Sequence, residues 1–212
     1  TVDEPSEDRA DIEPDDGHTN PTPGGASAED TGLKAIVDIA ALVEKNSDCI
    51  GWLQIPGTTV NHPVMFTHDD EEYYIRRDFS GNSSKSGCLF VGEYSKFDPQ
   101  CDNIIIYGHN MNSETMFNAL FAYEDEEFYL NHKTFRFDTV YGNGLYEIFA
   151  VFRTRILNVD EYGFRYYNYS GDLSEDDFNY YLENILELAE YDTGIDVEYG
   201  DNLLTLSTCA YH

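Results

Sequence analysis

The chain has 212 residues, of which 41% are hydrophobic and 15% aromatic, enough for one compact domain with a substantial core. Its 12 basic residues stand against 41 acidic ones, which gives a formal net charge of −29. Such a charge repels phosphate backbones and anionic lipids, so the composition argues against nucleic acid and membrane surfaces as partners. No run of about 18 apolar residues is present, so we expect no signal peptide or membrane span in this sequence.

The first 32 residues differ in composition from the rest. They hold ten Asp and Glu residues, one arginine (Arg9), four prolines and the pair Gly24-Gly25, with almost no large apolar side chains. A segment of this kind cannot bury enough surface to offset its ordering entropy. We therefore expect an acidic disordered linker over residues 1–32 and a single globular domain over residues 33–212.

An amphipathic helix and a series of strands are expected next. Residues 33–45 place apolar side chains on one face behind a candidate N-cap at Thr31, which predicts a helix. A final apolar run at residues 203–206 predicts a strand just before Cys209. Between them, short apolar or aromatic runs broken by turns predict strands at residues 50–55, 60–66, 87–92, 103–108, 135–139 and 145–153.

Helical patterns interrupt these strands. Shorter helices are expected at residues 70–77 and 113–123, and the longest over residues 173–191, where Ser174 and Asp177 resemble a capping box. Many strands with few, irregularly placed helices favour a mainly β fold over a regular parallel α/β fold. The sequence thus predicts a β-barrel with inserted helices.

A thiol and an imidazole each follow one of the predicted strands. Cys209 comes after the run at 203–206, and His109 after the run at 103–108. Residues at strand ends are held by the sheet yet project at its rim, so the two can meet there. A free thiol titrates near ~8.5, and a nearby imidazolium lowers that value and delivers a proton to the leaving group. The pair predicts a cysteine nucleophile suited to acyl transfer.

Packing or surface roles are the alternatives. A single cysteine after a strand is commonly a buried core residue. His62, His68 and His132 lie in or beside aromatic and acidic turns and are expected to be surface or turn residues. His18 lies in the acidic segment, and His212 is too close to the terminus to be a fixed base.

Three further cysteines, Cys49, Cys88 and Cys101, complete an even count of four. Four cysteines could form two disulfides or bind a metal cluster. The sequence has no C-x2-C pair, no His-x3-His spacing and no EF-hand loop. We therefore predict no bound metal and no cofactor.

Two motifs carry a resemblance to a known family. They are Thr205-Leu206-Ser207-Thr208-Cys209 and Asn103-Ile104-Ile105-Ile106-Tyr107-Gly108-His109-Asn110-Met111. With these motifs the chain resembles, over residues 33–212, a class B sortase, a cysteine transpeptidase of Gram-positive cell envelopes. Further similar segments follow in the same order: Gly51-Trp52-Leu53, Ile55-Pro56-Gly57-Thr58, Tyr73-Tyr74, Asp78-Phe79, Gly87 to Phe90, Thr115-Met116-Phe117 and Tyr146 to Val151.

The resemblance implies a fold and a reaction. The fold is a sortase-like β-barrel with an N-terminal helix and with a long helix before the strand at residues 203–206, which is the last strand in this sequence. The reaction is cleavage of a C-terminal sorting signal on a secreted protein after a threonine, with Cys209 forming a thioester and His109 acting as acid and then base. Ser207 and Thr208 would flank the substrate groove, with Thr208 the main contact.

The resemblance also implies partners and a location. The acceptor amine would belong to a peptidoglycan cross-bridge or precursor, or to a pilin lysine. The enzyme would be a monomer at the extracellular face of the plasma membrane, held by an anchor absent from this sequence. A hydrolytic cysteine peptidase and an inactive module that binds sorting signals are the alternative functions.

One family feature has no counterpart among these residues. Sortases use an arginine on the strand that follows the cysteine, whereas only Ala210, Tyr211 and His212 follow here. We therefore expect the domain to lack its C-terminal strand, and assign the arginine's role to no residue of the chain. Arg153 and Arg155 are expected to lie at a sheet edge or on the surface.

Overall fold

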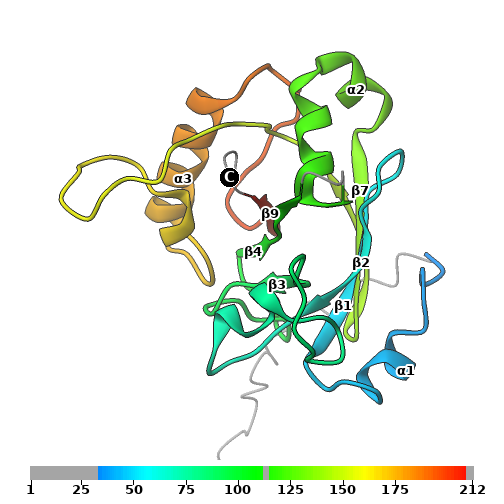
Figure 1. Cartoon of the computed structure of the whole chain (residues 1–212). Helices are drawn as coiled ribbons and strands as arrows, with labels where there is room; N and C mark the ends of the chain where they lie inside the picture. Colours follow the sequence, from blue (N-terminus) through cyan, green and yellow to red (C-terminus); the bar gives the residue numbers. More distant parts are fainter. Residues whose placement is uncertain (1–32, 112–114, 209–212) are drawn as a thin grey trace, which may run out of the picture.

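The computed structural model describes residues 33–111 and 115–208, and they form one curved sheet with helices around it (Figure 1). The sheet has seven strands in the order β8-β7-β1-β2-β3-β4-β9, and a separate two-stranded hairpin joins β5 and β6. The strands are β1 (Cys49–Gln54), β2 (Asn61–Met65), β3 (Leu89–Val91), β4 (Asn103–Tyr107), β5 (Asn110–Met111), β6 (Thr115–Met116), β7 (Thr134–Thr139), β8 (Gly142–Glu147) and β9 (Leu203–Ser207).

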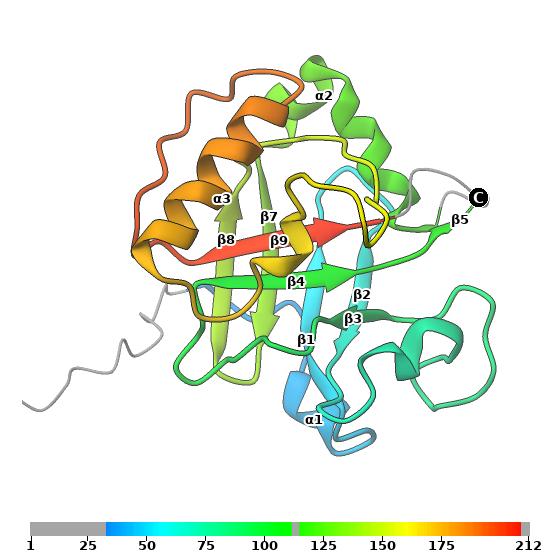
Figure 2. The same ribbon diagram turned by 90° about the vertical axis from the view of Figure 1, so that its left-hand side faces the viewer.

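Short helical segments connect the strands, and one longer helix precedes the last of them. Figure 2 shows this helix, α3, beside β4 and β9, which run next to each other. The mainly β fold expected from the sequence is confirmed. The helical elements are α1 (Ile39–Val43), η1 (Glu71–Arg76), η2 (Phe117–Glu124), α2 (Glu126–Asn131), η3 (Tyr166–Asn168) and α3 (Glu175–Leu188), where η denotes a 3-10 helix.

The apolar faces of the strands enclose the core. Leu53, Val64, Ile104 and Phe137 come from four different strands and belong to one buried cluster. A second cluster joins α3 to the sheet, where Phe178, Tyr181 and Ile185 pack with Leu203 of β9. The helix therefore supports the strand that leads to Cys209.

The N-terminal helix is shorter than the sequence predicts. It covers only α1, where the Asp38 carboxylate accepts a hydrogen bond from the Ala41 N–H at 3.0 Å. Residues before it are held on the sheet instead, because the Ile36 N–H donates to Asp138 and the Asn143 amide donates to the Leu33 carbonyl. Thr31, the expected cap, lies outside the described residues.

The helix predicted over 113–123 is confirmed only from Phe117 onward, as a 3-10 helix. Residues 112–114 lie outside the described part of the chain. The residues on either side of them pair as β5 and β6, and a 3-10 helix follows. Met116 ends the hairpin with a φ of 57°, and Phe117 beside it is fully buried. Pairing of β5 with β6 therefore takes Thr115 and Met116 out of the expected helix, which begins only at Phe117.

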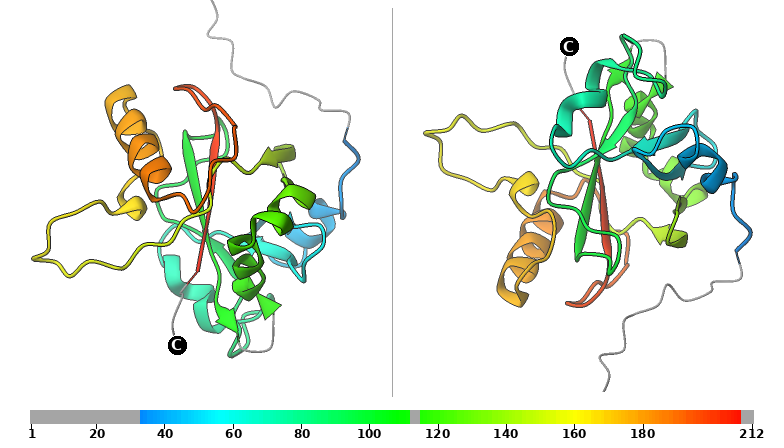
Figure 3. Two further views of the ribbon diagram at one scale, coloured as in Figure 1. Left: turned by 90° about the horizontal axis from the view of Figure 1, so that it is seen from above. Right: turned by 90° about the horizontal axis from the view of Figure 1, so that it is seen from below.

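The strand predicted over 145–153 also stops early, at Glu147. Beyond it the chain pairs with the segment after α3, because the Glu190 N–H donates to the Val151 carbonyl at 2.8 Å and Phe152 bridges to Ala189. From there the connection to η3 extends away from the rest of the fold, as both views of Figure 3 show. No helix in the described residues has the length and apolar character needed to cross a membrane.

Candidate active site

The parallel pairing of β4 with β9 is the framework of the site. Its register places Asn103 opposite Leu203 at one end and Tyr107 opposite Ser207 at the other. The pairing continues beyond the strands, because the Gly108 N–H donates to the Ser207 carbonyl at 3.1 Å and the Thr208 hydroxyl donates to the Gly108 carbonyl at 2.8 Å. The two strand ends are thus joined at the residues that immediately precede His109 and Cys209.

Cys209 itself lies outside the described residues. Its neighbour Thr208 is the last described residue of the chain, and His109 is described and half-buried.

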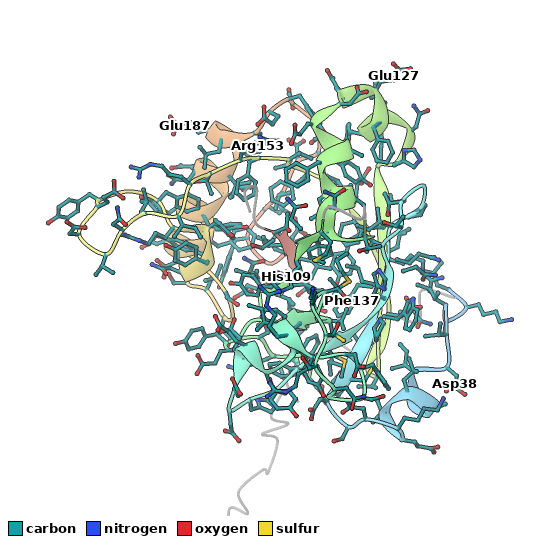
Figure 4. The ribbon with its side chains drawn as sticks, in the orientation of Figure 1. Asp38, His109, Glu127, Phe137, Arg153 and Glu187 are labelled. Carbon is teal, nitrogen blue, oxygen red and sulfur yellow. The ribbon has the colours of Figure 1, made fainter. Side chains whose placement is uncertain are left out.

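His109 is oriented by the backbone of η1. Its Nε2–H donates to the Ile75 carbonyl at 2.7 Å, and a carbonyl oxygen can only accept, so this contact assigns the proton to Nε2. The His109 carbonyl is fixed as well, because it accepts a hydrogen bond from the Phe117 N–H at 3.0 Å. Figure 4 shows His109 in the middle of the molecule.

Gly108 allows this tight arrangement. A Cβ at this position would lie 2.5 Å from Leu89 Cδ2 and 2.7 Å from Phe117 Cδ2, closer than real Cβ atoms approach. The site therefore requires glycine between Tyr107 and His109 for close packing.

The Ser207 and Thr208 hydroxyl groups both form hydrogen bonds within the protein. Ser207 is buried, and its Oγ lies 2.7 Å from the Tyr166 hydroxyl. Thr208 uses its hydroxyl on the Gly108 carbonyl. The Ser207 hydroxyl thus contacts η3 and the Thr208 hydroxyl contacts the backbone that follows β4, and contact with a substrate stays a prediction from the family resemblance.

A groove of about 1680 Å³ runs past these strand ends. His109, Ile75, Tyr166, Ser207 and Thr208 line it. Of the described histidines, only His109 does so. The groove is therefore the place where an extended ligand would meet His109.

Glu71 and Tyr107 also line this groove. Burial raises the pKa of the Glu71 carboxyl, and the nearby carboxylates Glu93 and Glu72 raise it further, although the Glu93 N–H donates to it and opposes the shift. Burial is also the main reason why the pKa of Tyr107 is raised. The His109 end of the groove is thus partly desolvated.

The sequence motifs did not reveal Ile75, Glu71 or Tyr166 as groove residues. Ile75 lies 34 positions before His109, and Tyr166 lies 41 positions before Ser207. The tyrosine-rich stretch around residues 162–169 was the one available signal, since aromatic residues in an irregular connection often line a ligand groove.

The other described histidines lie elsewhere. His68 meets the ring of Phe66 at 4.4 Å, and His132 donates from Nδ1 to the Phe128 carbonyl at 2.9 Å. His62 is in β2, where burial lowers its pKa. This confirms a surface position for His68, while His132 is half-buried at the C-terminal end of α2. The prediction is wrong for His62, which is a strand residue.

Cys49, Cys88 and Cys101 are free, buried thiols. Burial raises the pKa of each, and that of Cys88 to about 11. Disulfides among these three are therefore absent. Within the described residues no group of three or more His, Cys, Asp or Glu side chains is arranged to hold a metal ion.

The arginines expected at the surface are found there. Arg153 pairs with Glu124 and lies over the Phe121 ring at 5.3 Å, and it is labelled well apart from His109 in Figure 4. Arg155 is exposed and donates to Glu161 at 2.9 Å.

Comparison with known proteins gives the family. The chain is 31% identical to Sortase B of Listeria monocytogenes over 174 residues, which cover 81% of this chain and 67% of that protein. It is 28% identical to Sortase B of Staphylococcus aureus over 171 residues, 80% of this chain and 66% of that protein. The chain thus spans about two thirds of the length of these relatives.

The fold agrees with this relationship. The structure of a Staphylococcus aureus sortase B-substrate complex matches with a TM-score of 0.72 at 27% identity, covering 82% of this chain and 78% of that one. No protein-family model matches the chain. With its fold and the level of identity to Sortase B taken together, the chain belongs to the class B sortases, a family of cysteine transpeptidases of the cell wall.

Proposed function

We propose that this chain cleaves a C-terminal sorting signal of secreted proteins after threonine, through a thioester on Cys209, and transfers the product to an amine. The observation that supports this most strongly is the register of β4 with β9. Tyr107 and Ser207 are paired at the ends of the two strands. His109 and Cys209 each come two positions later in the sequence.

The proposed chemistry assigns a role to each group. The Cys209 sulfur attacks the threonine carbonyl, the carbon–nitrogen bond breaks, and the imidazolium of His109 protonates the departing amine. The incoming amine then attacks the thioester carbonyl and gives a proton to the neutral His109, while the carbon–sulfur bond breaks and the Cys209 thiolate leaves. Since Nε2 is held by the Ile75 carbonyl, we assign the proton exchange to Nδ1.

The relatives support the two substrate classes. A sortase B has been solved as a substrate complex, and another structure is Sortase B complexed with a glycine tripeptide. We propose that this chain also takes a sorting-signal peptide as donor and a peptide amine as acceptor. A peptidoglycan cross-bridge or precursor and a pilin lysine are the candidate acceptors, and the outer face of the plasma membrane is the proposed location.

The domain organisation completes the proposal. Residues 33–212 would form the catalytic domain, and the acidic composition of residues 1–32 suits a linker. Removal of residues 1–32 should leave peptide cleavage unchanged, because the groove and His109 are built from later residues.

Intact-mass spectrometry with a sorting-signal peptide tests the reaction. We expect an acyl adduct that peptide mapping places on Cys209, and we expect Cys209→Ala to abolish it. His109→Gln should prevent turnover, whereas His68→Gln, which changes a histidine outside the groove, should not. An adduct on another residue, or full activity of Cys209→Ala, would contradict the mechanism.

Supplying triglycine separates transfer from hydrolysis. A product larger by the acceptor mass indicates a transpeptidase, and the hydrolysed acid alone indicates a cysteine peptidase. Peptide binding without an adduct, together with an unreactive Cys209, would indicate a binding module.

A further inference from the structure

We infer that Tyr166 is a positioning residue that fixes the end of β9 through its hydrogen bond to Ser207 and thereby sets the place of the nucleophile. The inference rests on the proposed role of Cys209 and adds to it a residue from outside both sequence motifs. The juxtaposition that carries it is the 2.7 Å contact between the Tyr166 hydroxyl and Ser207 Oγ.

Backbone pairing with β4 is the first support of the end of β9. In the described sheet β9 is a terminal strand, paired with β4 on one side. The backbone bonds to β4 extend past the strand to Gly108 and hold this end of β9 along one edge. Leu204, Thr205 and Leu206 of β9 also line the groove.

Two tyrosines hold the polar side chains of this strand. Thr205 and Ser207 are two residues apart and so lie on the same face. The Tyr181 hydroxyl of α3 lies 2.8 Å from Thr205 Oγ1, and the Tyr166 hydroxyl lies 2.7 Å from Ser207 Oγ. Tyr181 therefore secures the middle of β9, and Tyr166 secures the end that leads to Cys209.

The Tyr166 ring is itself held in place. It meets the Phe152 ring edge-on at 5.7 Å and the Tyr167 ring at 5.4 Å. Its backbone begins η3, where the Tyr169 N–H donates to the Tyr166 carbonyl at 3.0 Å. A tyrosine fixed in this way holds Ser207 in a defined position relative to the connection between β8 and α3.

Loss of this bond should affect chemistry more than binding. A misplacement of about 1 Å can cost roughly 100-fold in rate, and an imidazolium lowers a thiol pKa only while it remains close. We expect Tyr166→Phe to lower kcat about tenfold or more, with KM nearly unchanged. The pH midpoint for alkylation of Cys209 by iodoacetamide should rise toward ~8.5.

The test compares Tyr166→Phe, Ser207→Ala and the double variant. Because the single changes remove the same bond, the double variant should be no slower than either one. Tyr181→Phe is the matched control, since it removes the hydroxyl on Thr205 from the same strand. We expect Tyr181→Phe to lower the melting temperature. The pH midpoint for alkylation of Cys209 should be the same in this variant as in the unsubstituted protein.

The possible results separate the two proposals. If Tyr166→Phe raises KM and leaves kcat and the alkylation midpoint unchanged, Tyr166 contacts substrate and is not a positioning residue. Additive losses in the double variant would also overturn the inference. Absence of a Cys209 adduct in the unsubstituted protein would instead contradict the proposed function, and the alkylation midpoints would still decide the role of Tyr166.

Discussion

At the scale of single residues, the site depends on a glycine that has no reactive group. Gly108 lies between the residue that pairs with β9 and the histidine, and its missing side chain leaves room for Leu89 and Phe117. Overpacking a buried position of this kind forces neighbouring groups to move. The geometry of His109 is therefore coupled directly to the core.

Gly108→Ala should lower the free energy of unfolding by about 1–3 kcal/mol and reduce peptide cleavage. Urea unfolding and a cleavage assay measure the two effects. Gly92→Ala is the control, because a Cβ there would make only ordinary contacts, the nearest at 3.4 Å from Tyr107. Equal stability of the two variants would contradict this account of Gly108.

Glu71 gives a prediction about pH. Burial raises its pKa above the ordinary 4.5, so the folded state disfavours the charged form. The resulting cost is absent at low pH, where the group is protonated in both states, and is fully present above the folded-state pKa. Glu71→Gln keeps an oxygen that can accept from the Glu93 N–H and removes the charge.

We therefore expect Glu71→Gln to melt at a higher temperature than the unsubstituted protein at about pH 7, and at the same temperature near about pH 3.5. Differential scanning calorimetry at the two pH values measures this. Glu187→Gln, which changes an exposed carboxylate of α3, should show neither effect. A larger gain at the lower pH would show that the sign is wrong.

The sequence contained the reacting pair of the proposed site but not its surroundings. His109 follows an apolar strand and matches a family motif, so a local pattern was enough to select it. The Ile75 carbonyl contacts His109 and the Tyr166 hydroxyl contacts Ser207. Both contacts form only when the chain has folded. No local spacing encodes such contacts, because they depend on how η1 and the β8–α3 connection pack.

At the scale of elements, α3 shows what local patterns predict well. Ser174 accepts a hydrogen bond from the Asp177 N–H at 3.1 Å, as expected for an N-cap. The Ser174 hydroxyl also donates to the Asp177 carboxylate at 2.7 Å. The apolar positions Phe178, Tyr181 and Ile185 are buried as the helical spacing predicts.

Ser174→Ala should therefore cost about 1 kcal/mol of stability, because it leaves the Asp177 N–H without its side-chain acceptor. Urea unfolding gives the value. Ser174→Asp restores an acceptor at the same position and should recover most of the loss. If the alanine and aspartate variants are equally stable, the cap contributes little to this helix.

Elements that depend on distant contacts were predicted less well. The expected 33–45 helix shrinks to α1 because Asp138 and Asn143 of the β7–β8 hairpin bind the preceding backbone. β8 ends at Glu147 because the chain beyond it pairs with residues after α3. In both cases a hydrogen-bond partner more than thirty positions away decides where the element stops.

At the scale of the whole molecule, the buried thiols predict selective reactivity. Cys49, Cys88 and Cys101 lie in the core with raised pKa values, so little thiolate is available on any of them near neutral pH. We expect one fast-reacting thiol in the native protein and four after unfolding in urea, measured with a chromogenic disulfide reagent.

Cys209→Ala should remove the fast phase and leave three thiols that react only after unfolding. A variant such as Cys101→Ala should retain the fast phase. Rapid reaction of two or more thiols in the native protein would contradict the burial of the core cysteines.

The pairing of β4 with β9 also affects how the protein is made. The two strands are one hundred residues apart along the chain, and contacts over such a separation form late because a long loop must close first. During synthesis, a chain that has emerged only through β8 contains His109 but not Cys209. Under the proposed function, His109 would meet Cys209 only after the last described strand docks, so the docking of β9 would time the onset of thioester chemistry.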